Sequence, residues 1–192
     1  MKIGILGGSF NPPHIGHLIL AQNVREAMGL DKVIFVPANI PPLKKQEDSL
    51  DAETRLHMVD LSIMDNPYFE SSKVEIERGG VSYTFETLRI FKEFFKNKTQ
   101  LFFIAGSDVL KNIHLWKKKE EIFELARFIV VTRKNFKIRP SLPKEIEKFE
   151  METIEISSSQ IREKIKRGES IRYVVPESVR KFIVEKKLYF KK

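Results

Sequence analysis

The chain has 192 residues, of which 42% are hydrophobic and 31% charged, contains no cysteine and carries a formal net charge of +8. This length suffices for one domain with a full core, and the lack of cysteine excludes disulfides and thiolate metal sites. No apolar run approaches the roughly 20 residues that span a bilayer, and the first strand begins too early for a signal peptide, so we expect a cytoplasmic protein without a membrane partner.

Apolar segments of strand length alternate along the chain with segments whose apolar residues recur at helical spacing. Strands are expected at residues 2–6, 32–37, 71–77, 100–105, 127–132 and 151–156. Helices are expected at residues 18–28, 51–64, 83–96, 117–125, 160–167 and 176–187. This alternation predicts an α/β fold, a doubly wound and mainly parallel sheet with helices on both faces. No linker or repeat divides the chain, so we expect a single domain over residues 1–192.

Loops with unusual compositions follow three of the predicted strands, at residues 7–14, 38–49 and 106–116. Ligands of open parallel sheets bind at the carboxyl ends of the strands, near the point where the strand order reverses. The fold would therefore gather these three loops at one edge of the sheet.

The first of these loops, with the sequence GGSFNPPHIGH over residues 7–17, leads from a strand into a helix. A helix that starts in this way presents backbone N–H groups and a positive dipole end to a phosphate. His14 and His17 lie three residues apart, on one face of the first helical turn. Gly16 costs about 1 kcal/mol there relative to alanine, which suggests that a ligand needs the space. The alternatives are a helix cap with a core histidine, and a metal pair that lacks a third ligand nearby.

The four residues His14-Ile15-Gly16-His17 resemble the HxGH signature of the nucleotidyltransferase superfamily. The later segment 156–162, ISSSQIR, is similar to the second signature of that superfamily, ISSTxIR. Between them, the segments 41–44 and 82–84, and 106–108 followed by Trp116, resemble bacterial nicotinate-nucleotide adenylyltransferases. The closing segment 176–189 is also similar to that family, so the resemblance covers nearly the whole chain.

The chain departs from the family pattern at several positions. Ser9 and Asn11 stand where the family often has Thr and Asp, and Leu43 stands where it often has His. Lys117 follows Trp116, where the family often has an aromatic residue. The departure at Leu43 either removes one expected phosphate contact or moves it to Lys44. The departure at Lys117 concerns the pocket for the base.

The resemblance implies a Rossmann-like fold and the reaction of nicotinate mononucleotide with ATP, giving nicotinate adenine dinucleotide and pyrophosphate. It implies Mg²⁺ bound with ATP as co-substrate, and no dedicated protein metal site, because Mg²⁺ keeps waters and substrate oxygens. The catalytic residues carried over are His14, His17, Lys44 and Arg162. The ATP-binding residues carried over are Gly7, Gly8, Ser9, Phe10, His14, His17, Gly106, Asp108, Ile156, Ser157, Ser158 and Arg162. The mononucleotide-binding residues carried over are Asn39, Lys44, Thr84, Trp116 and Arg133.

Several of these residues also have purely structural interpretations. Trp116 is a single large aromatic residue that could belong to the core, and Thr84 and Asp108 could cap the turns that they begin. The three lysines at 117–119 are typical of a solvated helix start. The phenylalanine-rich helix at 83–96 is core or an oligomer face, so a homo-oligomer remains open.

Two other classes of protein compete with this interpretation. Within the enzymes, the rivals are the nicotinamide-mononucleotide and phosphopantetheine adenylyltransferases. Outside them, a nucleic-acid-binding protein is suggested by the charge of residues 96–192, which is +11 against −3 for residues 1–95. The basic residues are mixed with glutamates along the predicted helices, so we expect no nucleic-acid partner.

Overall fold

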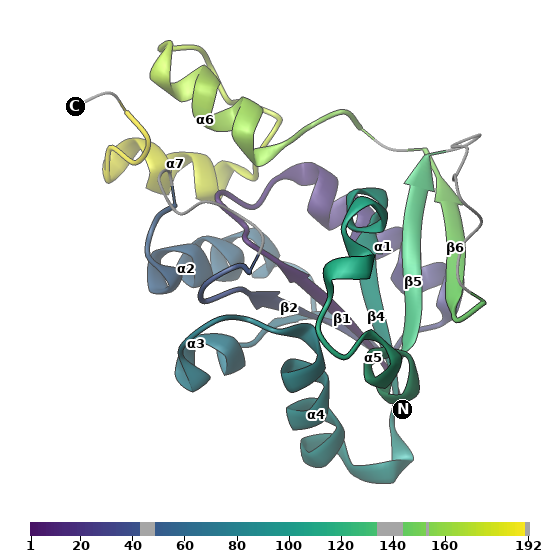
Figure 1. Cartoon of the computed structure of the whole chain (residues 1–192). Coiled ribbons are helices and arrows are strands. Elements are labelled where there is room, and N and C mark those ends of the chain that lie inside the picture. Colours follow the sequence, from purple (N-terminus) through teal and green to yellow (C-terminus); the bar gives the residue numbers. More distant parts are fainter. Residues whose placement is uncertain (43–48, 134–143, 153, 191–192) are drawn as a thin grey trace.

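The computed structural model describes residues 1–42, 49–133, 144–152 and 154–190, and a six-stranded parallel sheet forms its centre (Figure 1). The strands are β1 (Lys2–Gly8), β2 (Lys32–Pro37), β3 (Phe69–Ser71), β4 (Gln100–Gly106), β5 (Arg127–Arg133) and β6 (Ile146–Met151). Their order is β3-β2-β1-β4-β5-β6, and every neighbouring pair is parallel. The strand order reverses between β1 and β4, which places the expected ligand site there.

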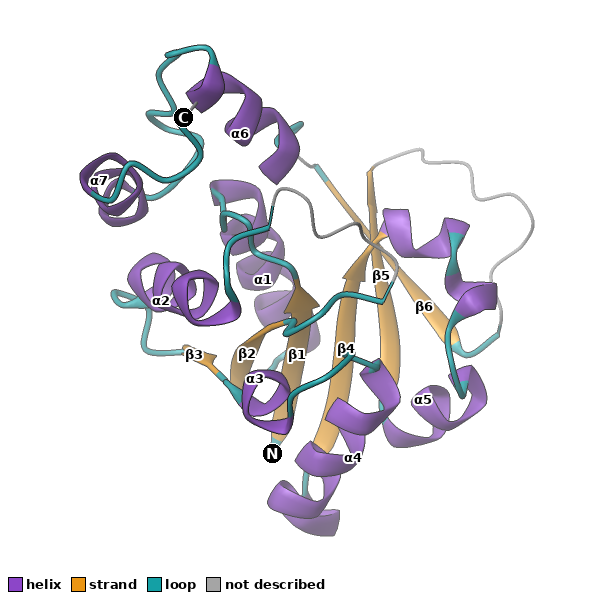
Figure 2. Cartoon of the chain, turned by 60° about the vertical axis from the view of Figure 1, so that its left-hand side comes forward, coloured by secondary structure: helices purple, strands orange, loops and turns teal. Residues whose placement is uncertain are grey.

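Helices cover both faces of this sheet, as predicted (Figure 2). On one face, α1 (Ile15–Met28) and α2 (Ala52–Ile63) bury apolar residues against Phe35. On the other face, α4 (Thr84–Phe95) and α5 (Lys119–Leu125) pack on Ile34. The strands read as near-continuous apolar runs because successive residues point into opposite, equally buried layers.

A third apolar cluster joins the C-terminal helices to the rest of the domain. It contains residues of α6 (Ser158–Lys166) and α7 (Glu177–Glu185) together with Met58 of α2. The Ser178 hydroxyl donates a hydrogen bond of 2.7 Å to the Leu61 carbonyl. Figure 1 shows α6 on the side to which the arrowheads of β5 and β6 point, so α6 lies at the edge of the sheet where ligands bind.

Four shorter helices complete the described chain: α3 (Val74–Arg78) and the 3-10 helices η1 (Lys96–Lys98), η2 (Ser107–Lys111) and η3 (Ile113–Leu115). Most predicted boundaries are confirmed within three residues. The helix α1 begins three residues earlier than expected, because its N-cap is His14. Gly29, with φ +59°, ends α1 in a left-handed turn, which glycine adopts without the strain of a side chain.

Two predicted strands are wrong. The segment 71–77 is not one strand, because β3 ends at Ser71 and the following residues turn into α3. There the Glu75 side chain is buried and accepts a hydrogen bond of 2.5 Å from the Thr87 hydroxyl. The strand expected at 151–156 lies earlier, at Ile146–Met151, where it pairs with β5 as an edge strand.

The described helices are too short or too polar to cross a membrane. The residues that the structure leaves undescribed include Leu43, Lys44 and most of the basic loop at 133–143. Predictions about these positions therefore lie outside the described residues. The Arg133 backbone closes β5, but its side chain is outside the description as well.

Candidate active site

Two adjoining cavities open at the carboxyl ends of β1 and β4, where the strand order reverses. The larger one, of about 570 Å³, contains both histidines and is here named the histidine cavity. The smaller one, of about 380 Å³, contains Trp116 and is named the tryptophan cavity. Their shared wall consists of Gly7, Gly8, Ser9, Pro41, Gly106, Asp108 and Val109. A group bound above this wall would touch both cavities.

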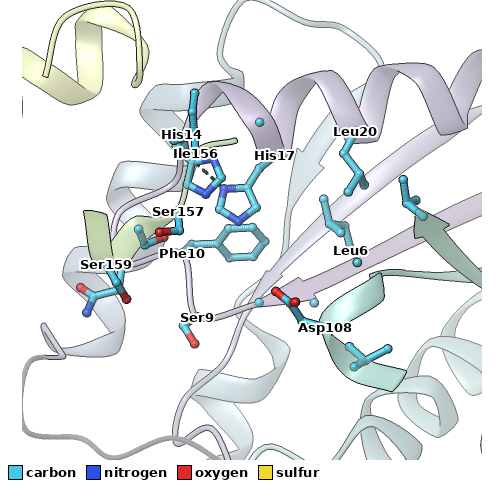
Figure 3. Close-up of a pocket in the computed structure, with 18 of the residues that line it drawn as sticks. Leu6, Ser9, Phe10, His14, His17, Leu20, Asp108, Ile156, Ser157 and Ser159 are labelled. Carbon is cyan, nitrogen blue, oxygen red and sulfur yellow. Dashed lines mark hydrogen bonds between the residues drawn. The ribbon is translucent and has the colours of Figure 1, made fainter. Parts of the chain in front are cut away.

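The histidine cavity brings together residues that are far apart in the sequence. Its walls are the loop after β1, the first turn of α1, η2 and the first turn of α6 (Figure 3). All twelve residues that the resemblance assigns to ATP line this cavity. The twelve residues therefore form one continuous surface, although they come from both ends of the chain.

His14 and His17 stack on each other, with their ring centroids 3.7 Å apart. The His14 backbone N–H donates to His17 Nδ1 at 3.1 Å, and the His17 N–H donates to the His14 carbonyl at 2.9 Å. Because Nδ1 of His17 accepts a proton donor, the neutral ring carries its own hydrogen on Nε2. His17 can therefore donate a hydrogen bond through Nε2 to a bound phosphate.

His14 is only 8% exposed, and this burial lowers its pKa to about 4. The imidazole is therefore uncharged at neutral pH and acts through hydrogen bonds rather than as a cation. Its Nδ1 atom is buried and has no hydrogen-bond partner among the described residues. A buried polar atom without a partner is costly, and this one faces the position where Gly16 lacks a Cβ atom.

Glycine is not the residue that turns the chain after β1. Gly7 and Gly8 still belong to the strand, and the residue with a left-handed conformation is Phe10, with φ +46°. Such a conformation is uncommon for a bulky residue and is found where function requires a strained loop. The Phe10 ring is buried edge-on against His17, at 5.0 Å, so it supports the imidazole from below.

Gly16 leaves room for a neighbouring side chain rather than for a ligand. A Cβ atom at this position would lie 3.0 Å from Nδ1 of His14. We expected a ligand to need this space, but the His14 ring occupies it. The absence of a Cβ atom at Gly16 thus allows the His14 ring to fold back over the first turn, and the lower helix propensity of glycine is the cost.

The start of α6 holds the first loop from the opposite side. Ser157 caps α6 by accepting a hydrogen bond from the Gln160 N–H at 3.2 Å. The Ser158 hydroxyl donates to the Pro12 carbonyl at 2.8 Å, and Arg162 Nη1 donates to the Asn11 carbonyl at 2.9 Å. The Nε atom of Arg162 is buried and has no hydrogen-bond partner among the described residues. The second motif therefore fixes the first loop and still lines the cavity.

Arg55 was not among the predicted site residues, and it links the loop after β1 to the loop after β2. Its guanidinium is fully buried and donates to the carbonyls of Ser9 at 2.8 Å, Asn39 at 3.0 Å and Leu50 at 3.0 Å. Five N–H donors in a rigid fork allow one arginine to join three backbone segments. Arg55 shares the buried face of α2 with Met58 and Ser62. This helical spacing is the sequence signal that could have indicated the burial of Arg55.

The tryptophan cavity is built around Trp116, which follows η3. The Trp116 ring packs edge-on against Phe103 at 5.9 Å and Phe128 at 5.7 Å, so it belongs partly to the core and partly to the cavity. Thr84, the first residue of α4, also lines the cavity. Asn39 does not line it, because its amide donates to the Gly80 carbonyl at 2.9 Å and so supports the wall.

Glu75 is a second buried residue of the site that was not predicted. This carboxyl group is 6% exposed, lines the tryptophan cavity and accepts a hydrogen bond from Thr87. Its burial raises its pKa above the usual value for glutamate. A glutamate between two apolar residues, Val74 and Ile76, gave no signal in the sequence, because alternation of this kind is typical of an exposed strand residue.

Known proteins resemble this chain along nearly its whole length. A model of the cytidylyltransferase-like family matches residues 5–164. A probable nicotinate-nucleotide adenylyltransferase of Lactiplantibacillus plantarum is 43% identical over 188 residues, which cover 98% of this chain and 88% of the relative. The nicotinate-nucleotide adenylyltransferase of Bacillus subtilis is 41% identical over 191 residues, which cover 98% of each chain.

Solved structures share the fold. A nicotinic acid mononucleotide adenylyltransferase of Plasmodium falciparum, complexed with NaAD, has a TM-score of 0.81 at 21% identity and covers 98% of this chain and 97% of its own. A putative nicotinate-nucleotide adenylyltransferase of Vibrio parahaemolyticus has a TM-score of 0.73 at 22% identity, with 98% and 94% covered. From the full-length sequence matches, this chain belongs to the nicotinate-nucleotide adenylyltransferase family.

Proposed function

We propose that the protein transfers the adenylyl group of ATP to nicotinate mononucleotide, giving nicotinate adenine dinucleotide and pyrophosphate, in NAD biosynthesis. The pair of cavities that meet over β1 and β4 carries this proposal. Transfer between two nucleotides requires adjoining sites, because the attacking and leaving groups must be held in line. The family of the relatives names the same reaction.

The chemistry is a displacement at phosphorus. A phosphate oxygen of the mononucleotide attacks the α-phosphorus of ATP and forms a new P–O bond. The bond from the α-phosphorus to the bridging oxygen breaks, and pyrophosphate leaves with that oxygen and its electron pair. No protein nucleophile is needed, so the chain contributes alignment and stabilisation of charge.

The histidine cavity suits the phosphates of ATP. His17 would donate through Nε2, and the N-termini of α1 and α6 would direct their positive dipole ends at the phosphates. The buried Nε of Arg162 is a further donor toward this space. Such donors accelerate the step where they are aimed at charge that develops on the leaving pyrophosphate. Ser158 would act mainly through the loop, because its hydroxyl already donates to Pro12.

Mg²⁺ would bind together with ATP. Among the described residues, no group of three or more His, Cys, Asp or Glu is arranged to hold a metal ion. Asp108 is the one carboxylate among the residues that line the histidine cavity. This sparse set fits Mg²⁺, which keeps several waters and is held largely by substrate phosphates. The ion would supply neutralisation of phosphate charge.

The tryptophan cavity suits the base of the mononucleotide. Trp116 would offer a flat face to the pyridine ring, and the first turn of α4 with the Thr84 hydroxyl would face the ring substituent. Hydroxyl and backbone N–H donors suit a carboxylate, which has only acceptors, better than a carboxamide. Lys44 and Arg133 remain predictions for contacts to the phosphate of the mononucleotide.

The proposal is tested by supplying Mg²⁺ and ATP with nicotinate mononucleotide, nicotinamide mononucleotide or phosphopantetheine in separate reactions. We expect pyrophosphate and a dinucleotide, identified by its mass, with nicotinate mononucleotide, at a kcat/KM about a hundredfold above that of the amide. Preferential turnover of phosphopantetheine or of the amide would show that nicotinate mononucleotide is not the preferred substrate. Absence of pyrophosphate with all three, across pH and temperature, would overturn the proposed reaction.

A further inference from the structure

Building on the proposed function, we propose that the Lys117 ammonium selects the carboxylate of nicotinate mononucleotide over the carboxamide of its amide counterpart. Lys117 would be a specificity-determining residue, and its charge would act on the substituent of the pyridine ring rather than on the phosphate.

Three consecutive lysines, at 117–119, differ in their partners. Lys118 pairs with Glu121 at 3.9 Å, and Lys119 pairs with Glu120 at 3.7 Å. Lys117 forms no ion pair with a carboxylate in the described part of the chain, and it alone of the three lines the tryptophan cavity. A solvated helix start thus explains Lys118 and Lys119, which begin α5, but not Lys117.

An aromatic contact holds Lys117 at this position. Its Nζ atom lies 4.1 Å from the centroid of the Tyr83 ring, within the range of a cation–π contact. Tyr83 is the N-cap of α4, directly before Thr84. The ammonium therefore lies beside the helix end whose dipole also favours an anion. A neutral ring leaves the charge of the lysine available to a carboxylate.

The charges of the cavity explain why a cation is required. The charged residues among its lining are Glu75, Asp108 and Lys117. Asp108 opposes the entry of an anion, whereas burial raises the pKa of Glu75 and the charges of Arg78 and Arg55 act on Glu75 from outside the lining. Lys117 is the one cation in the described lining itself. A carboxamide carries no charge and gains nothing from this arrangement. The ammonium thus favours the acid selectively.

The experiment measures kcat/KM for nicotinate mononucleotide and for its amide in the wild type and in Lys117→Gln. The two substrates share ribose and phosphate, so their ratio isolates the substituent on the ring. We expect Lys117→Gln to lower kcat/KM for the acid about tenfold, chiefly through KM, as for loss of one charge-assisted hydrogen bond. The value for the amide should stay within about twofold. Lys117→Arg should retain most of the preference, because the charge remains.

Lys118→Gln is the matched control, because it removes an adjacent lysine that does not line the cavity and should leave the ratio unchanged. Raised salt should reduce the preference of the wild type more than that of Lys117→Gln, because screening acts on the ion pair. An equal ratio in the wild type and in Lys117→Gln would overturn the inference while the reaction itself persists. Failure of the proposed function would instead appear as no turnover of either mononucleotide by the wild type.

Discussion

The histidine cavity and the tryptophan cavity share one wall but are held together by different forces. In the histidine cavity, three backbone carbonyls of the loop after β1 accept hydrogen bonds from side chains. Ser9 accepts from Arg55, Asn11 from Arg162 and Pro12 from Ser158. In the tryptophan cavity, side-chain packing of Trp116 on Phe103 and Phe128 sets the shape. A backbone cradle gives a fixed geometry to phosphates, whereas a pocket of side chains can change its choice of base by single substitutions.

The largest expected effect is a loss of kcat from a substitution that alters the histidine cavity and leaves the tryptophan cavity intact. His17→Asn keeps an acceptor near Nδ1 for the His14 N–H and removes the donor at Nε2. Loss of one such donor typically lowers kcat by about 10²–10³-fold. We expect this loss in steady-state kinetics, with KM for the mononucleotide within about threefold and an unchanged melting temperature.

His57→Asn is the control for that substitution, because His57 packs edge-on against Phe182 at 4.7 Å and lines neither cavity. It should leave turnover within about twofold. A folded His17→Asn variant with near-normal kcat would show that His17 supports the loop but does not contact the phosphates.

The second effect concerns the stability of the histidine cavity in acid. The pKa of His14 is lowered from 6.5 to about 4 by burial, so the folded state binds fewer protons than the unfolded state between these values. The free energy of unfolding should therefore fall as the pH drops through this window, by at most about 3 kcal/mol from this residue.

Urea unfolding at pH 7.0, 5.5 and 4.5 measures this contribution when the wild type is compared with His14→Asn. The difference in free energy of unfolding should shrink toward low pH, because only the wild type must protonate the buried ring. Comparison with the variant cancels the contributions of other titrating groups to the pH dependence. Glu75 is one of them, and its raised pKa changes the free energy of unfolding in the opposite direction. Parallel pH profiles would show that His14 is not desolvated in solution.

The third effect is a rise in KM for the mononucleotides when the tryptophan cavity is altered. Trp116→Ala removes the flat face and should raise KM for both mononucleotides about tenfold, in line with the stacking energy of a base on an aromatic ring. KM for ATP should stay within about twofold, since Trp116 does not line the histidine cavity. Trp116→Phe keeps an aromatic face and should restore most of the affinity. Equal losses for ATP and mononucleotide would mean that the two cavities are not separate sites.

The smallest effect sharpens the choice within the tryptophan cavity. Thr84→Val keeps the shape of the side chain and removes its hydroxyl, so the acid should lose about fivefold in kcat/KM, as for one neutral hydrogen bond. The amide should change less, and the ratio of the two should narrow. Thr84→Ser serves as the control that retains the hydroxyl. A ratio that Thr84→Val leaves unchanged would assign recognition of the carboxylate to backbone N–H groups and Lys117.

The sequence by itself determined most of the elements and much of the lining of the histidine cavity. The buried strands β1, β2, β4 and β5 are continuous apolar runs, and Ser157 and Gly29 mark helix ends through local chemistry. Among the residues that line the cavity, His14 and His17 lie in one short motif and Ser157, Ser158 and Arg162 in another, so their spacing alone places them on helix starts. Each of these features depends on neighbours within a few residues.

Only the tertiary structure decided the parts that depend on distant partners. Arg55 contacts Ser9 across 46 positions of the sequence, and this contact turns a helical arginine into the link between two loops. Glu75 lies in α3, where a strand was expected, and its buried carboxyl group accepts a hydrogen bond from the distant Thr87. Lys117 differs from Lys118 only because the chain places it at the cavity, beside Tyr83. Burial and charge at such positions follow from packing, which no local pattern records.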